Sequence, residues 1–134
     1  AMMDEFLRVH QFINFSTNTP MQYAIADFLR DNPQHHRELG HFYQQKRDLF
    51  LELMAPSRFK LIPSSGTYFQ LADYSAISTE PDTEFTTRLT RDNKIAAIPV
   101  SVFYELAPDQ QVIRFCFAKH EETLREAVKR LVDL

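Results

Sequence analysis

The stretch Val112-Ile113-Arg114-Phe115-Cys116-Phe117 decides the fold, because its residues alternate as they do in a β-strand with one buried face. Ile113, Phe115 and Phe117 share one face, which we expect to lie against a hydrophobic core. Arg114 lies on the opposite face of the same strand, which makes it the most unusual residue of the stretch.

The sequence before this strand changes from helical periods to short strands. Helices are predicted over residues 2–13, from Thr19-Pro20, with Thr19 as the cap, and from Asn32-Pro33 to about Met54. The later part of the chain is expected to hold strands over 59–62, 67–72, 95–98 and 112–117, and helices over 81–92 and 121–134. This order predicts an α+β (α/β) fold: a small antiparallel or mixed sheet of three or four strands, packed by helices and preceded by helices.

Composition excludes several classes of function. The chain has 134 residues and a formal net charge of −3, which gives no reason to expect nucleic acid or an anionic membrane as a partner. No stretch approaches the roughly 20 apolar residues of a membrane span. Two glycines are too few for a glycine-rich phosphate loop, and one cysteine excludes an internal disulfide. We expect a cytoplasmic protein with no membrane or nucleic-acid partner.

Arg114 is the strongest candidate for a ligand-binding residue. An arginine between apolar neighbours on a central strand is costly unless an anion or polar group meets it. Its planar guanidinium can hold a carboxylate through two parallel hydrogen bonds. The residue pattern leaves two interpretations open, which are an anchor for the carboxylate of a ligand and a structural ion pair with an acid of the same domain.

Two other groups of residues suggest chemistry only weakly. His35, His36 and His41 are close in sequence, but a separation of five residues between His36 and His41 suits a shared metal ion poorly. We expect them to be surface histidines, and no metal site is predicted. Cys116 sits in an apolar strand with no adjacent motif, and is expected to be inert filler and not a nucleophile.

The polar run of residues 14–19 is either a helix-capping loop or a ligand-contacting loop that carries one aromatic side chain, Phe15. Phe12, Phe103 and Tyr104 also lie outside the expected apolar stripes. Such aromatic residues suggest surfaces that another domain or another chain covers.

Four segments, taken in order, resemble the C-terminal part of class I/II pyridoxal-phosphate (PLP) aminotransferases of fold type I, and most of all the methionine and kynurenine aminotransferase branch. The helix Phe42-Tyr43-Gln44-Gln45-Lys46-Arg47-Asp48 also fits. The segments are Val9-His10-Gln11-Phe12 through Ser16-Thr17-Asn18-Thr19-Pro20-Met21-Gln22; Gly66-Thr67-Tyr68-Phe69 with Ala72-Asp73-Tyr74-Ser75; Ala97-Ile98-Pro99-Val100-Ser101-Val102-Phe103-Tyr104; and Ile113-Arg114-Phe115-Cys116-Phe117-Ala118-Lys119.

The resemblance implies roles for two residues. Arg114 aligns with the family arginine that holds the α-carboxylate of the substrate, and Phe15 with an aromatic residue that crosses the dimer interface and lines the other subunit's substrate pocket. The resemblance also implies a homodimeric parent enzyme that uses PLP to transfer an amino group from a methionine-like, aromatic or kynurenine-like amino acid to a 2-oxo acid.

The sequence departs from the family where the chemistry lies. The family's Schiff-base lysine, the aspartate paired with the pyridine nitrogen and the phosphate-binding residues are expected upstream of residue 1, and none of the five lysines here matches their motifs. No catalytic or cofactor-binding residue is therefore predicted. We expect residues 1–32 to be a helical segment that follows a missing large PLP-binding domain, and residues 33–134 to be the C-terminal small domain.

Two further expectations follow. The chain alone is expected to be inactive and to hold no covalently bound PLP. The alternative is a free-standing, non-catalytic α+β module that binds a small molecule or a protein, with Arg114 accepting a regulatory carboxylate.

Overall fold

A computed structural model describes residues 2–106 and 110–134 of the chain. The chain divides into two compact units, Ala1–Leu39 and Gly40–Leu134. The two units are defined by the contacts that residues make within this chain. The assignment of residues 1–32 and 33–134 to parts of a larger enzyme concerns the family, and it stays a prediction.

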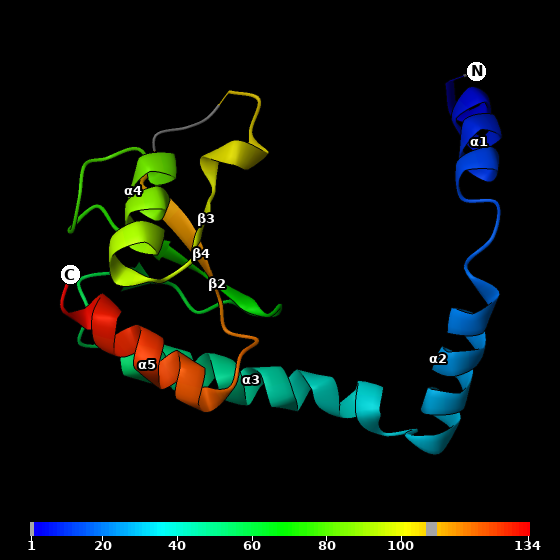
Figure 1. Cartoon of the computed structure of the whole chain (residues 1–134), viewed down its shortest axis with the longest axis horizontal. Coiled ribbons are helices and arrows are strands. Elements are labelled where there is room, and N and C mark those ends of the chain that lie inside the picture. The colour runs from blue at the N-terminus through cyan, green and yellow to red at the C-terminus, as the bar shows by residue number, and fades with distance from the viewer. Residues whose placement is uncertain (1, 107–109) are drawn as a thin grey trace. The chain divides into compact units, whose positions relative to one another are not determined.

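The first unit contains α1 (Met2–Ile13), α2 (Thr19–Asp31) and the start of α3 (His35–Met54), which are drawn in blue and cyan in Figure 1. The helix predicted over residues 2–13 is confirmed. The cap of α2 differs from the prediction, because Asn18 and not Thr19 accepts a hydrogen bond from the backbone N–H of Met21, at 3.2 Å. No residue of α1 or α2 is buried.

The second unit contains the predicted small sheet. Its strands are β1 (Lys60–Leu61), β2 (Phe69–Asp73), β3 (Ile98–Pro99) and β4 (Val112–Cys116), in the spatial order β1-β2-β4-β3. Every neighbouring pair is antiparallel. The sheet is therefore antiparallel, which is one of the two arrangements that the sequence predicted.

The strand predicted over residues 95–98 is shorter than expected. Lys94 adopts a left-handed conformation with φ of 60°, which ends the preceding helical turn, and the N–H of Ile95 still donates to Leu89 at 3.2 Å. The chain reaches extended geometry only at Ile98. As a result β3 pairs with β4 at two positions alone.

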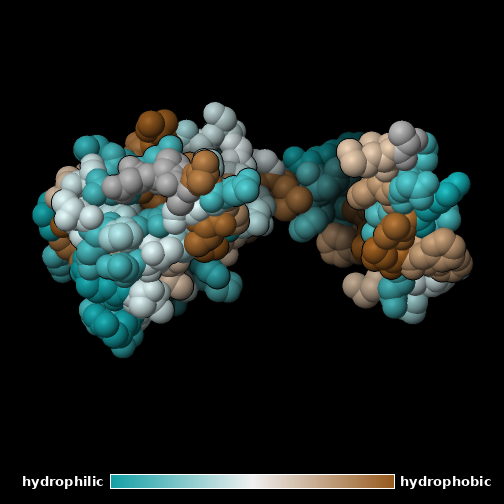
Figure 2. Space-filling view, turned by 90° about the horizontal axis from the view of Figure 1, so that it is seen from above, coloured by the Kyte–Doolittle hydropathy of each residue, from teal (hydrophilic) through white to brown (hydrophobic). Residues whose placement is uncertain are grey.

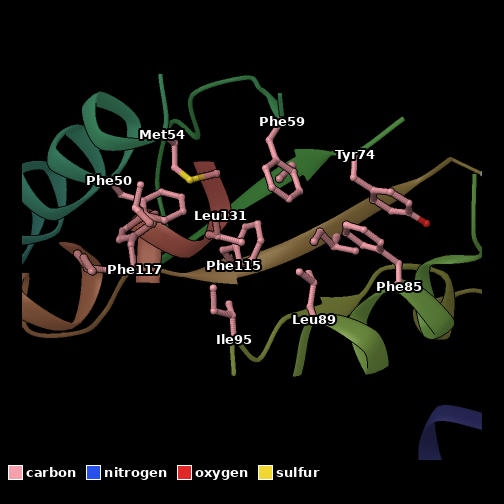
Figure 3. Packing of buried hydrophobic residues seen from close by; sticks show 14 residues of the cluster. Phe50, Met54, Phe59, Tyr74, Phe85, Leu89, Ile95, Phe115, Phe117 and Leu131 are labelled. Atoms are coloured by element: carbon pink, nitrogen blue, oxygen red, sulfur yellow. The ribbon is translucent and has the colours of Figure 1, made fainter. Parts of the chain in front are cut away.

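Three helices bury their apolar sides against the sheet. They are α3, α5 (Glu121–Val132) and α4 (Asp82–Arg88), which continues into a π-helical turn over Leu89–Asn93. Apolar residues of α4 and α5, among them Phe85 and Leu131, belong to one core, which Figure 3 shows from close by. In this core the rings of Tyr74 and Phe85 stack at 4.1 Å, and the Tyr74 hydroxyl donates to the backbone carbonyl of Glu80 at 2.7 Å.

Among the described residues of the second unit, helices cover one face of the sheet. Ile113 and Phe115 of β4 are buried, as the alternation predicts, and so is Ala72 of β2. Arg114 and Cys116 lie on the other face, and Cys116 is exposed. The interpretation of Cys116 as inert filler inside an apolar strand is therefore wrong about its surroundings. Strand alternation separates two faces but does not say that both are covered.

The exposed side of α5 carries two ion pairs. Arg125 and Glu121 lie 3.9 Å apart. Glu126 pairs with Lys129 and not with Arg130, whose side chain donates to the backbone carbonyl of Asn93 at 3.4 Å.

Within the described ranges, none of the helices has the length and apolar character that a bilayer crossing needs.

Candidate functional site

Arg114 occupies the centre of the uncovered face of the sheet. It pairs with Leu71 of β2 on one side and with Ile98 of β3 on the other. Residues directly opposite each other on antiparallel strands project to the same side, so these three side chains form one row across the face. Leu71 is 46% exposed and Ile98 38%, so an apolar border surrounds the arginine without enclosing it.

The guanidinium of Arg114 is in contact with two aromatic rings. Its Cζ atom lies 4.6 Å from the centre of the Phe69 ring and 5.5 Å from that of Phe103. Among residues 2–106 and 110–134, no acid forms an ion pair with it. The described residues therefore do not contain the structural ion pair that the sequence left open. Ring contacts leave the N–H groups of a guanidinium, which lie in its plane, free to donate to a carboxylate.

Phe103 reaches Arg114 from a short 3₁₀ turn, Ser101–Phe103, which follows β3 and is drawn in yellow in Figure 1. Asp82, at the start of α4, fixes this turn. Its carboxylate accepts hydrogen bonds from the Ser101 N–H at 2.7 Å and from the Ser101 hydroxyl at 2.6 Å. Asp82 is only 9% exposed, so both bonds are largely shielded from water.

A cavity of about 350 Å³ lies along β4 toward α5. Its lining is mostly apolar and includes Ile95 and Leu124, together with Lys94 and Lys119. Arg114 borders this cavity, but neither Phe69 nor Phe103 does. The aromatic rings that meet the guanidinium therefore lie outside the cavity, and the candidate carboxylate site is on the open face of the sheet.

Phe15 lies in the first unit, between α1 and α2, and is 90% exposed. The polar run around it is a capping loop: Asn18 caps α2, and the Gln22 side chain donates to the carbonyl of Thr17 at 2.7 Å. Capping does not exclude contact with a ligand, and the role of Phe15 stays a prediction. Within the second unit the structure brings Phe69 and Phe103 to Arg114, and Phe15 belongs to the first unit.

The histidines His35, His36 and His41 are exposed. The ring of His35 lies 5.0 Å from that of Phe28, edge to face. Within the part of the chain that the structure describes, no group of three or more histidine, cysteine, aspartate or glutamate residues could hold a metal ion.

Sequence reasoning missed the partners of Arg114. Phe69 could have been found, because the alternation of residues 67–72 already puts it on the same face as Leu71, and only the strand pairing was lacking. Phe103 and the contact between Asp82 and Ser101 could not, since an irregular turn has no period from which a contact can be predicted.

Comparison with known proteins identifies the family. Residues 1–131 match the sequence model of the family described as aminotransferase class I and II. The chain belongs to this family. It is 48% identical over 130 residues to methionine aminotransferase of Escherichia coli, covering 97% of this chain and 34% of that protein. It is 33% identical to kynurenine–oxoglutarate transaminase of Dictyostelium discoideum, covering 93% of this chain and 34% of the relative.

Similarity to solved structures leads to the same family. The chain superposes on YbdL from Escherichia coli, whose structure was reported with a methionine aminotransferase function, with a TM-score of 0.86 and 49% identity over 95% of this chain. It superposes on N-succinyldiaminopimelate aminotransferase from Mycobacterium tuberculosis with a TM-score of 0.81 and 31% identity over 92% of this chain. It covers 34% and 32% of those chains. The chain thus spans about a third of the length of the relatives that it matches.

The cavity along β4 does not fit PLP by itself. A PLP site needs a lysine amine, an acid at the ring nitrogen and donors for the phosphate. Lys94 and Lys119, which border the cavity described above, are exposed, and the Lys94 ammonium donates to the backbone carbonyl of Arg91. No aspartate or glutamate is among the residues that line this cavity. This cavity therefore lacks an acid that could pair with the ring nitrogen of PLP.

Proposed function

We propose that this chain is the substrate-carboxylate-binding part of a PLP-dependent aminotransferase. The parent enzyme transfers an amino group from an amino acid, of the methionine, aromatic or kynurenine-like kind, to a 2-oxo acid. The observation that carries the proposal is an arginine at the centre of an uncovered sheet face, whose guanidinium contacts two aromatic rings and has no acidic partner among the described residues. The proposal is supported by the names of the relatives.

Arg114 would act by positioning. A guanidinium that holds both oxygens of the α-carboxylate fixes the substrate in two dimensions, and thereby limits the orientations of the α-carbon. The apolar residues Leu71 and Ile98 beside it lower the local polarity, which strengthens a charged contact once a substrate excludes water. The α-amino group and the cofactor would be held by parts of the enzyme outside this chain.

Phe15 would complete the substrate pocket of a second subunit in a homodimer. Its support is its exposure, together with the exposed apolar residues of α1 and α2, which Figure 2 shows as brown and tan surface on the first unit. Phe12 at 80% and Met21 at 57% exposure belong to this surface. A cytoplasmic location, like the dimer, is part of the proposal.

The test of the carboxylate role is Arg114→Ala in the full-length protein that carries this chain. We expect kcat/KM for the amino acid to fall at least about tenfold, with KM raised, because the variant loses a charge-assisted contact with substrate. Steady-state kinetics with methionine and a 2-oxo acid measure it. Unchanged kinetics would reject the carboxylate role.

A second test asks whether the 134-residue chain alone binds PLP or transaminates. We expect it to fold but neither to transaminate nor to gain the visible absorbance of covalently bound PLP after incubation with the cofactor. A visible cofactor band that borohydride reduction abolishes, found in this chain alone, would overturn this part of the proposal.

A further inference from the structure

We propose that Phe69 and Phe103 are positioning residues that hold the Arg114 guanidinium ready for a carboxylate, and that Asp82 keeps Phe103 in place through Ser101. The inference rests on the carboxylate-binding role of Arg114 given above. It adds the residues that orient this half-buried arginine.

The two rings reach the guanidinium from different parts of the chain. Phe69 pairs with Cys116 and is therefore the diagonal neighbour of Arg114 on the adjacent strand, within reach of a long side chain. Phe103 comes from the turn after β3, on the other side of β4. The two contacts, at 4.6 and 5.5 Å, lie within the range of cation–π attraction.

Contact with ring faces solves a physical problem of the site. An arginine side chain on an open sheet face has several rotatable bonds, and each substrate that binds must fix them. Aromatic neighbours restrict the guanidinium and remove water from it without using its N–H groups, which an acidic neighbour would occupy. Phe69 and Phe103 thus orient the cation while leaving its hydrogen-bonding capacity for the substrate.

The position of Phe103 does not come from burial, because its side chain is 63% exposed. It comes from the backbone of its turn. Besides the two bonds from Ser101 to Asp82, the Phe103 N–H donates to the carbonyl of Val100 at 3.2 Å. Loss of the Asp82 carboxylate would release the turn at its first residue, and would move Phe103 without altering the ring itself.

Tyr104 provides a matched control. It directly follows Phe103, it is 51% exposed, and its ring is not in contact with the guanidinium. A residue that merely contributed apolar surface in this region would respond to replacement by leucine as Tyr104 does. A residue that orients Arg114 would respond differently, because leucine fills space but provides no π-face.

The experiment uses the full-length protein and two probes of nearly the same shape, 4-(methylthio)butanoate and its primary amide, which lacks the negative charge and has an NH2 group in place of one oxygen. Their inhibition constants are measured for wild type and for Phe103→Leu, Phe103→Tyr, Phe69→Leu, Asp82→Asn and Tyr104→Leu. The ratio of the two constants gives the preference for carboxylate over amide, and a general structural defect lowers the binding of both probes and leaves this ratio unchanged.

We expect Phe69→Leu and Phe103→Leu each to lower the carboxylate preference about fivefold, through loss of cation–π contact. Phe103→Tyr keeps a π-face and should retain the preference. Asp82→Asn should lower the preference less than Phe103→Leu does, and Tyr104→Leu should leave it unchanged. If Phe69→Leu fails to fold, the exposed pair Phe103→Leu and Phe103→Tyr still decides.

The Arg114→Ala variant separates this inference from the proposed function. If wild type prefers the carboxylate and Arg114→Ala does not, while Phe69→Leu and Phe103→Leu keep the wild-type ratio, the positioning role is rejected and the carboxylate role stands. If Arg114→Ala itself keeps the preference, or wild type has none, the proposed function fails and this inference fails with it. Equal changes in Phe103→Leu and Tyr104→Leu would also reject the positioning role.

Discussion

The two units of this chain have similar amphipathic helices, but the apolar residues of these helices are buried in one unit and exposed in the other. In Gly40–Leu134 the apolar stripes of α3, α4 and α5 meet a sheet, and Phe85, Leu89 and Leu131 are almost completely buried. In Ala1–Leu39 the stripes of α1 and α2 are as regular, yet no residue of either helix is buried. Amphipathic periodicity therefore predicts a helix in both units but a core in only one, because a core needs a second layer.

The difference also bears on function. The core unit carries Arg114 on a strand that is fixed by its neighbours on both sides, as a residue that orients a ligand must be. The first unit carries Phe15 on a loop between helices that lack a core of their own. Under the proposed function the geometry of Arg114 is set within this chain, whereas that of Phe15 depends on what covers α1 and α2.

The largest expected effect comes from paired truncations of aromatic side chains, Phe85→Ala in the core unit and Phe12→Ala in the first. Phe85 is fully buried and stacks on Tyr74, so its removal should cost about 3–5 kcal/mol of unfolding free energy. Phe12 is 80% exposed, and its removal should cost less than about 0.5 kcal/mol. Urea denaturation of the 134-residue chain measures both, and similar costs would mean that the first unit has a core after all.

The sequence predicted the parts of the fold that depend on period. The burial of Ile113, Phe115 and Phe117 follows from alternation along one strand, and so does the position of Arg114 on the opposite face. The exposure of Cys116 on that face was not predicted, because the apolar residues beside it in the sequence suggested a buried thiol. Whether a face is covered depends on other elements of the fold.

Features set by irregular backbone escaped prediction. The segment before β3 has apolar residues typical of a strand, but the left-handed Lys94 and the bond from Ile95 to Leu89 delay its start to Ile98. The same holds for the candidate site. Its arginine could be predicted from pattern and family resemblance, but the ring of Phe103 comes from a turn that is defined by its hydrogen bonds to Asp82.

A smaller difference between the two units is expected in how much their ion pairs add to the unfolding free energy, and this difference depends on pH. Hydrogen bonds from Arg88, and then from Ser78, hold the pKa of Glu80 below its ordinary value of 4.5. Because the pKa is depressed in the folded state, the pair stabilises the fold fully above pH 4.5, and this stabilisation is lost as the pH falls through the folded pKa. Both side chains are about one-third exposed, so the contribution is at most about 1 kcal/mol.

Replacement of Glu80 by glutamine tests this contribution. Glu80→Gln should lower the unfolding free energy at neutral pH and reduce its decline between pH 5 and pH 3. Glu5→Gln is the matched control, because Glu5 pairs with Arg8 at 3.2 Å on α1, where both side chains are at least 70% exposed and no core depends on the helix. An equal effect of the two variants would contradict the distinction between the units.

The smallest change in stability is expected from the largest deletion. Removal of residues 1–33 leaves all of α3 and every buried residue of the chain, since the core begins at Phe50. The unfolding free energy of the remaining chain should therefore change by less than about 0.5 kcal/mol, in line with the loss of exposed residues alone. The excised peptide should be mostly non-helical in water, because helices of 12 and 13 residues without a packed face are marginal. Thermal denaturation followed by circular dichroism measures both. A deleted chain that no longer unfolds cooperatively would show that α1 and α2 stabilise the second unit, and that the two units are one folding unit in solution.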